Sequence, residues 1–193
     1  MKKGFFILFF SMLALAASAQ EGKWFAGTAS IGVFDGGTGM APFTGFMQDK
    51  SGNGEKMTRI GLAPELGYFF TDKFCVGMGV FYSHVKLEAA MGKTKLNIVG
   101  FNPYACYYFW GVGNFSFYAR GGIDFASMSV KDGGNSTYFA IGVYPGITYN
   151  LTEAIALSAS FGQLAYQDFD NDSSSFGLSL DANTLNFGFT VTF

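Results

Sequence analysis

Alternation of large apolar residues with small or polar ones recurs along most of this chain, and the last nine residues, LNFGFTVTF, show it most simply. The large apolar side chains on one side are Leu185, Phe187, Phe189, Val191 and Phe193. A period of two places successive side chains on opposite faces of a β-strand, whereas a helix repeats about every 3.6 residues. The pattern therefore predicts strands, each with one apolar face and one polar face.

Eight such segments are predicted. They run over Lys23–Phe34, Arg59–Phe70, Phe74–Val85, Lys95–Phe109, Phe115–Ser127, Tyr138–Asn150, Ala154–Tyr166 and Asn183–Phe193. Each can cross a bilayer as a tilted strand, which takes about 9–11 residues. Short turns (TDK, WGVGN, LTE) alternate with longer polar loops at 35–58, 86–94, 128–137 and 167–182. This alternation of short and long connections is typical of outer-membrane barrels.

Composition indicates which way the apolar faces point. Charged residues make up 13% of the 193 residues, against 49% hydrophobic and 19% aromatic. A soluble domain carries about 25% charged residues, so a sandwich with its polar faces in water is disfavoured. The net charge of −2 offers no basic surface for nucleic acid. We therefore expect an all-β fold, an eight-stranded antiparallel up-and-down transmembrane β-barrel, with its apolar faces against outer-membrane lipid and lipopolysaccharide.

The first residues predict a cleaved export signal. MKK is a short basic start, and GFFILFFSMLALA is an apolar run that is short for a membrane helix. Ala17, Ser18 and Ala19 then form the small-residue pattern of a cleavage site. We expect a signal peptide at residues 1–19 and an outer-membrane barrel at residues 20–193. The alternative is an uncleaved anchor helix.

Four charged residues fall on the faces predicted to point into the lumen. Arg59 and Glu65 share one side of the second segment, and Arg120 and Asp124 share one side of the fifth. An isolated ion in a dry interior is very costly, so we expect these four to form a paired network. Together with the small residues around them they would fill the narrow interior of an eight-stranded barrel.

The two cysteines fall on neighbouring segments and on lumen-facing positions. Export from the cytoplasm permits a disulfide between Cys75 and Cys106. Cross-strand partners must lie almost directly opposite each other, and the register between the two segments cannot be read from the pattern. A disulfide and a pair of buried free thiols therefore both remain open.

The single histidine is the main candidate for catalysis. His84 follows Ser83 directly, so the two side chains should point to opposite faces of a strand. Nucleophilic catalysis needs the base within hydrogen-bonding reach of the hydroxyl, and no such arrangement lies on one face. We predict no catalytic residue and no enzymatic activity.

An acidic stretch in the last long loop is the main candidate for a metal site. Asp168, Asp170 and Asp172 have the spacing that begins a calcium-binding loop. Ser173 and Ser179 stand where such a loop needs glycine and glutamate, so it is not an EF-hand. A solvated acidic loop or a weak divalent-cation site remain as alternatives, and no metal or cofactor is predicted.

Three stretches resemble a known family: APELGYFFTDKFCVGMGVFYS (Ala63–Ser83), NPYACYYF (Asn102–Phe109) and YPGITYNLTEAIALSASFG (Tyr144–Gly162). They are similar to the outer-membrane β-barrel domain family common in Bacteroidota, and the size is similar to OmpX-like and OmpA transmembrane barrels. The resemblance implies that the terminal strand, with Phe189, Val191 and Phe193, acts as a signal for the barrel-assembly machinery. Periplasmic chaperones would be further partners during biogenesis.

The function is less constrained than the fold, because a fold does not imply a function. A structural or surface-interaction barrel with a filled lumen is the first possibility, its extracellular loops contacting a ligand that the pattern does not identify. A narrow porin for small solutes is the second, although eight strands leave an interior just filled by side chains. A lipid A-modifying enzyme is the third, and it lacks the serine–histidine arrangement it would need.

We expect the mature chain to begin at Gln20 and to fractionate with the outer membrane. A compact barrel resists detergent unfolding, so the unboiled protein should migrate faster than the boiled protein in detergent gels. N-terminal sequencing, membrane fractionation and paired gel lanes measure this. Equal mobility in both lanes, with the protein in the soluble periplasmic fraction, would contradict the barrel prediction.

Overall fold

The computed structural model describes residues 23–32, 42, 44–51, 55–89, 92–131, 133–170, 173–180 and 185–193. These residues form one twelve-stranded sheet in which all the strand pairs are antiparallel. Within this part of the chain, no helix combines the length and the apolar character needed to span a membrane. The predicted signal peptide and Gln20 lie outside the described residues.

The strands are β1 (Lys23–Gly32), β2 (Gly45–Lys50), β3 (Lys56–Leu62), β4 (Glu65–Thr71), β5 (Phe74–Ala89), β6 (Gly92–Val112), β7 (Phe115–Val130), β8 (Asn135–Asn150), β9 (Ile155–Ser160), β10 (Gln163–Phe169), β11 (Ser173–Ser179) and β12 (Asn186–Thr192).

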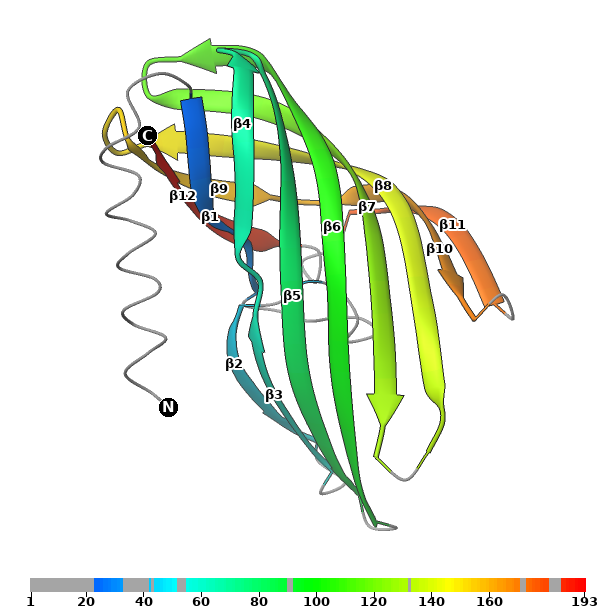
Figure 1. Cartoon of the computed structure of the whole chain (residues 1–193). Coiled ribbons are helices and arrows are strands. Elements are labelled where there is room, and N and C mark those ends of the chain that lie inside the picture. Colours follow the sequence, from blue (N-terminus) through cyan, green and yellow to red (C-terminus); the bar gives the residue numbers. More distant parts are fainter. Residues whose placement is uncertain are drawn as a thin grey trace.

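Eight of these strands pair in a ring (Figure 1). β4, β5, β6, β7 and β8 pair in chain order, β8 pairs with β9, β9 with β12, β12 with β1, and β1 with β4. The ladder that closes the ring joins the first and last described strands, and Trp24 and Phe193 exchange backbone hydrogen bonds of 3.0 and 2.8 Å. The remaining strands widen the sheet beyond the ring, with β2 on β3, β3 on β5, β10 on β8 and β11 on β10.

The described residues form twelve strand segments where eight were predicted for the chain. The predicted second segment is split into β3 and β4 at Pro64, which has no backbone N–H to donate to a ladder. The predicted seventh segment is split into β9 and β10 next to Gly162, whose φ is 80°. β2 and β11 account for the other two strands, and both lie in regions predicted to be loops.

The predicted loops at 86–94 and 128–137 were wrong, because most of their residues belong to strands. β5 and β6 run for 16 and 21 residues and are separated only by residues 90–91. The predicted turn WGVGN was also too long, since β6 continues to Val112 and the turn residue Gly113 has a φ of 58°. Apolar alternation ends where a strand leaves an apolar environment, but backbone pairing continues beyond that point.

The predicted faces are confirmed by burial. On β8, Ala140 is 1% exposed and its neighbour Ile141 is 48% exposed, and on β7 Asp124 is buried beside the exposed Phe125. Among the residues that the structure describes, the interior holds two apolar clusters. One contains Ala63, Phe81, Val85, Ile98, Ala126, Tyr138 and Ala140, and the other contains Phe25, Cys75, Tyr104, Cys106 and Tyr118.

Large rings fit inside the sheet because glycines lie directly opposite them on neighbouring strands. The four cross-strand pairs are Phe25 with Gly67, Tyr104 with Gly77, Phe81 with Gly100, and Tyr118 with Gly146. A Cβ atom at any of these glycines would overlap the facing ring. The missing side chain on one strand therefore provides the space that the ring on the next strand occupies.

We expect Gly100→Ala to destabilise the protein, because the new Cβ would meet both the Phe81 ring and the backbone carbonyl of Phe125. Overpacking of this kind costs about 1–3 kcal/mol. Gly121→Ala is the matched control, since nothing lies within 4 Å of a Cβ at that position. Urea unfolding of the refolded protein in detergent measures both variants. Equal effects at the two positions would contradict the packing role assigned to Gly100.

Candidate functional site

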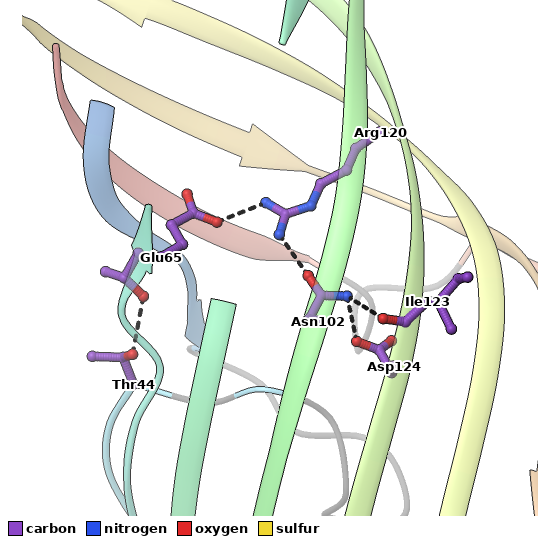
Figure 2. Close-up of polar contacts among 7 residues, drawn as sticks. Thr44, Glu65, Asn102, Arg120, Ile123 and Asp124 are labelled. Carbon is purple, nitrogen blue, oxygen red and sulfur yellow. Dashed lines mark hydrogen bonds and ion pairs between the residues drawn. The ribbon is translucent and has the colours of Figure 1, made fainter. Parts of the chain in front are cut away.

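Arg120 on β7 is at the centre of a polar cluster inside the ring of strands (Figure 2). Its Nη1 donates to Oε2 of Glu65 on β4 at 3.0 Å, and its Nη2 donates to Oδ1 of Asn102 on β6 at 2.8 Å. Because β5 and β6 lie between β4 and β7 in the ring, the ion pair between Arg120 and Glu65 crosses the interior. The guanidinium carbon also lies 3.4 Å from the centre of the Tyr104 ring.

Asn102 extends this cluster to a second carboxylate. Its Nδ2 donates to Oδ1 of Asp124 at 2.6 Å and to the carbonyl oxygen of Ile123 at 3.1 Å. The Tyr144 hydroxyl donates to the other oxygen of Asp124 at 3.4 Å. The amide of Asn102 thus accepts from Arg120 on one side and donates to Asp124 on the other. We call Glu65, Arg120, Asn102 and Asp124 the lumenal bridge.

Burial makes these contacts matter for stability. Glu65 and Asp124 are 8% and 7% exposed, so each carboxylate has lost most of its contact with solvent. Burying an ion costs several kcal/mol unless close, charge-assisted hydrogen bonds replace its hydration. In the lumenal bridge the ion pair with Arg120 replaces the lost hydration of Glu65. The hydrogen bond from the Asn102 amide replaces that of Asp124.

The structure brings three of the four predicted network residues together. Glu65 and Arg120 pair directly, and Asp124 joins them through Asn102. Arg59 lies fully buried on β3, where its Nη2 donates to the Ser83 hydroxyl at 3.3 Å. Asn102 was missed as a member, as was the ring contact of Tyr104. Alternation placed both on the lumenal side, but it does not say which residues on other strands they meet.

A cavity of about 440 Å³ lies beside the lumenal bridge. Its lining includes Arg120 and Glu65 at one end and Lys23, Asp72 and Glu153 at the other. These last three belong to the end of the sheet where short turns join the strands. There the hydrogen bond from the Lys23 ammonium, reinforced by its charge, lowers the pKa of Asp72 below its usual value. The interior is thus hollow on the short-turn side of the lumenal bridge.

The two cysteines lie next to each other on this cavity. Cys75 on β5 is directly opposite Cys106 on β6, and the two are 1% and 6% exposed. Both are free thiols in this structure. The predicted lumenal, neighbouring positions are therefore confirmed, and the register, which the sequence left open, places the two residues in one cross-strand pair.

The serine and histidine considered for catalysis lie on opposite faces, as alternation predicted. Ser83 is fully buried and accepts a hydrogen bond from Arg59. His84 is only partly buried, and its Nδ1 lies 2.8 Å from Oδ1 of Asn97 on the neighbouring strand. This arrangement gives the imidazole no contact with the Ser83 hydroxyl.

The two described carboxylates of the acidic stretch contact protein groups. The Tyr166 hydroxyl donates to Asp168 at 3.1 Å, and the backbone N–H and hydroxyl of Thr137 donate to Asp170. The hydrogen bond from the Thr137 backbone is the main cause that lowers the pKa of Asp170. Asp172 lies outside the described residues. Within the part of the chain that is described, no three His, Cys, Asp or Glu side chains are placed to hold a metal ion.

The residues predicted as an assembly signal lie at the ladder that closes the ring. Phe189 is opposite Thr28 and Val191 is opposite Ala26 on β1. Phe193 continues the same ladder through its two backbone hydrogen bonds to Trp24. The role of these residues in assembly stays a prediction.

The model of the family described as outer membrane protein beta-barrel domain matches residues 5–193. The chain therefore belongs to this family, and it is a protein of the Gram-negative outer membrane.

Several solved structures are similar to the chain. Neisserial surface protein A is 21% identical, with 90% of this chain and 98% of that chain covered and a TM-score of 0.49. The in-vitro folded, trimeric outer-membrane protein OmpT of Vibrio cholerae is 14% identical, with 91% and 53% covered and a TM-score of 0.36. No curated protein has a significantly similar sequence.

Breaking the ion pair of the lumenal bridge should be strongly destabilising. We expect Glu65→Ala and Arg120→Ala each to lower the free energy of unfolding by about 3–5 kcal/mol, because each leaves a buried charge without its partner. Ile141→Ala, on the exposed outer face, should cost less, since detergent or lipid replaces the lost contact. Urea unfolding of the refolded protein in detergent compares the three. A severe loss for Ile141→Ala with none for the charge deletions would reverse the assignment of inner and outer faces.

Proposed function

We propose that this chain is an eight-stranded outer-membrane barrel of the small, OmpX-like size class that does not conduct solutes. Its role is structural or interactive at the cell surface, and it is not catalytic. The observation that carries this proposal is the ion pair between Arg120 and Glu65, at 3.0 Å across the interior. A salt bridge between strands that are not neighbours occupies the cross-section through which a solute would have to pass.

The apolar cluster around Phe81, Val85 and Ile98 supports a closed lumen at a second level. Met57 on β3, Leu96 on β6, Met128 on β7 and Phe169 on β10 pack against this cluster. An ion that passed the lumenal bridge would meet this apolar layer, where its hydration could not be replaced. An eight-stranded interior is also just wide enough for side chains to fill it.

The length of the central strands supports a role at the cell surface. β5, β7 and β8 each have 16 residues and β6 has 21, whereas about 9–11 residues cross the hydrocarbon layer. Short turns lie on the periplasmic side of outer-membrane barrels, so the surplus projects outward as paired hairpins. A rigid sheet wall beyond the lipopolysaccharide-bearing surface is suited to contacts with other molecules.

Biogenesis by the usual export route accompanies this proposal. The signal peptide at residues 1–19 would direct the chain to the periplasm, where chaperones keep it soluble. The terminal strand with Phe189, Val191 and Phe193 would then engage the barrel-assembly machinery. Its pairing with β1 is compatible with this role, because the same strand closes the ring.

A narrow pore for small solutes is the second candidate, and the cavity of about 440 Å³ favours it. That cavity would serve as a vestibule, with Arg120 and Glu65 at its inner end. Lipid A modification receives no support from Ser83 and His84, whose side chains lie on opposite faces of β5.

Reconstitution into planar bilayers tests the closed lumen. We expect no current above that of the protein-free bilayer, with a larger porin as the positive control. Glu65→Gln is the control for contaminating porins. Removing the charge of Glu65 should change the ion selectivity of a current that passes through this lumen, but not that of a current through a contaminant. Reproducible conductance steps whose selectivity changes in Glu65→Gln would overturn the proposal in favour of the narrow pore.

A further inference from the structure

The cysteine pair beside the cavity lies in a regular part of the sheet. Cys75 and Cys106 are directly opposite in a register that runs unshifted from Phe74 and Tyr107 to Ala89 and Gly92. Both side chains point to the interior, where they pack in the same cluster as Tyr104 and Tyr118. Neither cysteine takes part in the lumenal bridge, so the proposed function leaves them without a role.

The backbone places the two cysteines close enough for a covalent bond after a small local shift of the strands. The N–H of Tyr108 donates to the carbonyl of Lys73 at 2.8 Å, and in an antiparallel ladder the hydrogen-bonded pairs recur at every second residue. Cys75 and Cys106 are therefore also a hydrogen-bonded pair, with Cα atoms about 5.5 Å apart. Disulfides join Cα atoms about 4.4–6.8 Å apart and Cβ atoms about 3.5–4.5 Å apart. Directly opposite Cβ atoms lie about 4.5–5.5 Å apart, so the bond requires the two strands to move slightly closer at this pair but needs no change of register.

The surroundings supply the oxidising conditions. The cavity that the two cysteines line extends to Lys23, Asp72 and Glu153 at the short-turn end of the sheet. In an outer-membrane barrel this end faces the periplasm. The periplasm is a compartment where disulfides form and persist.

We propose that Cys75 and Cys106 form a cross-strand disulfide in the mature protein. One cysteine, as its thiolate, attacks the disulfide of a periplasmic thiol oxidase or of a small-molecule disulfide, which gives a mixed disulfide and releases one thiol of the oxidant. The second cysteine then attacks the mixed disulfide, and the bond between the two Sγ atoms forms as the second oxidant thiol leaves. The oxidant takes up two electrons, and the two thiol hydrogens end on its two sulfur atoms.

The bond would stabilise the sheet next to the lumenal bridge. Cys106 lies directly opposite Arg120 on β7. A disulfide between β5 and β6 would therefore lie next to the residue that pairs with Glu65 across the interior. A cross-link also restricts the unfolded chain, which raises the stability of the folded state relative to it.

Differential alkylation of the full-length protein tests the proposal. Cells are treated with N-ethylmaleimide before lysis, and the protein is purified from the outer membrane, unfolded, reduced and labelled with an isotopically heavy maleimide. We expect mass spectrometry to find only the heavy label on Cys75 and Cys106, and the unreduced digest to contain the two peptides joined, with the loss of two hydrogen atoms. Cys75→Ser and Cys106→Ser are the controls, and each should leave one thiol that takes the first label.

N-ethylmaleimide on both cysteines of the wild-type protein would show that both were free thiols and would overturn the proposal. A mixed disulfide of each cysteine with a separate small-molecule thiol would overturn it as well. To ensure that the thiols are reachable by the first reagent, that labelling is repeated in the presence of detergent that unfolds the protein. Heat-dependent mobility in gels confirms that the two serine variants have assembled.

Discussion

Complete pairing of the backbone is the constraint on which the rest of this structure depends. In a lipid bilayer no water can satisfy an open N–H or C=O group, so a sheet that crosses the membrane must close on itself. Here the ladder between β1 and β12 does this, and the hydrogen bonds between Trp24 and Phe193 complete it at the end of the chain. Closure turns one face of each strand in the ring inward. The ion pair of the lumenal bridge and the enclosed cavity follow, because strands separated in the ring face each other only in a closed sheet.

The interior combines two ways of occupying a narrow space. Near the middle, Arg120 forms an ion pair with Glu65 and a hydrogen bond with Asn102, and Asn102 donates to Asp124. Each of these three charged groups therefore has a close hydrogen-bonding partner. Toward the long hairpins, an apolar cluster around Phe81 and Ile98 takes over. On the short-turn side the interior is hollow, and there the cysteine pair meets the cavity. These two packed levels are the basis of the proposal that the lumen is closed, although the short-turn end of the interior is open.

Several features of the candidate site could be predicted from single strands, and others depended on pairs of strands. Alternation placed Glu65, Arg120 and Asp124 inside and Ile141 outside. Their exposure agrees, since Glu65 and Asp124 are buried and the Arg120 side chain is 16% exposed, whereas Ile141 is 48% exposed. It also separated Ser83 from His84. It did not identify Asn102 as the link to Asp124, nor the contact between Arg59 and Ser83, because alternation assigns a face and says nothing about neighbours. The long loops were mispredicted for a related reason: outside the membrane, backbone pairing continues without an apolar pattern to signal it.

The sequence by itself determined that the chain forms strands, which face of each is apolar, and that the polar faces carry too little charge for a soluble protein. These properties are local, since each residue's face depends only on the period of two along its own strand. The tertiary structure alone decided the register, and with it that Cys75 meets Cys106 and that Arg120 reaches Glu65 across the interior. Register is a property of whole ladders. A slip of one residue would exchange the inner and outer faces of a strand, so the partners emerge only when every strand pairs at once around the closed ring.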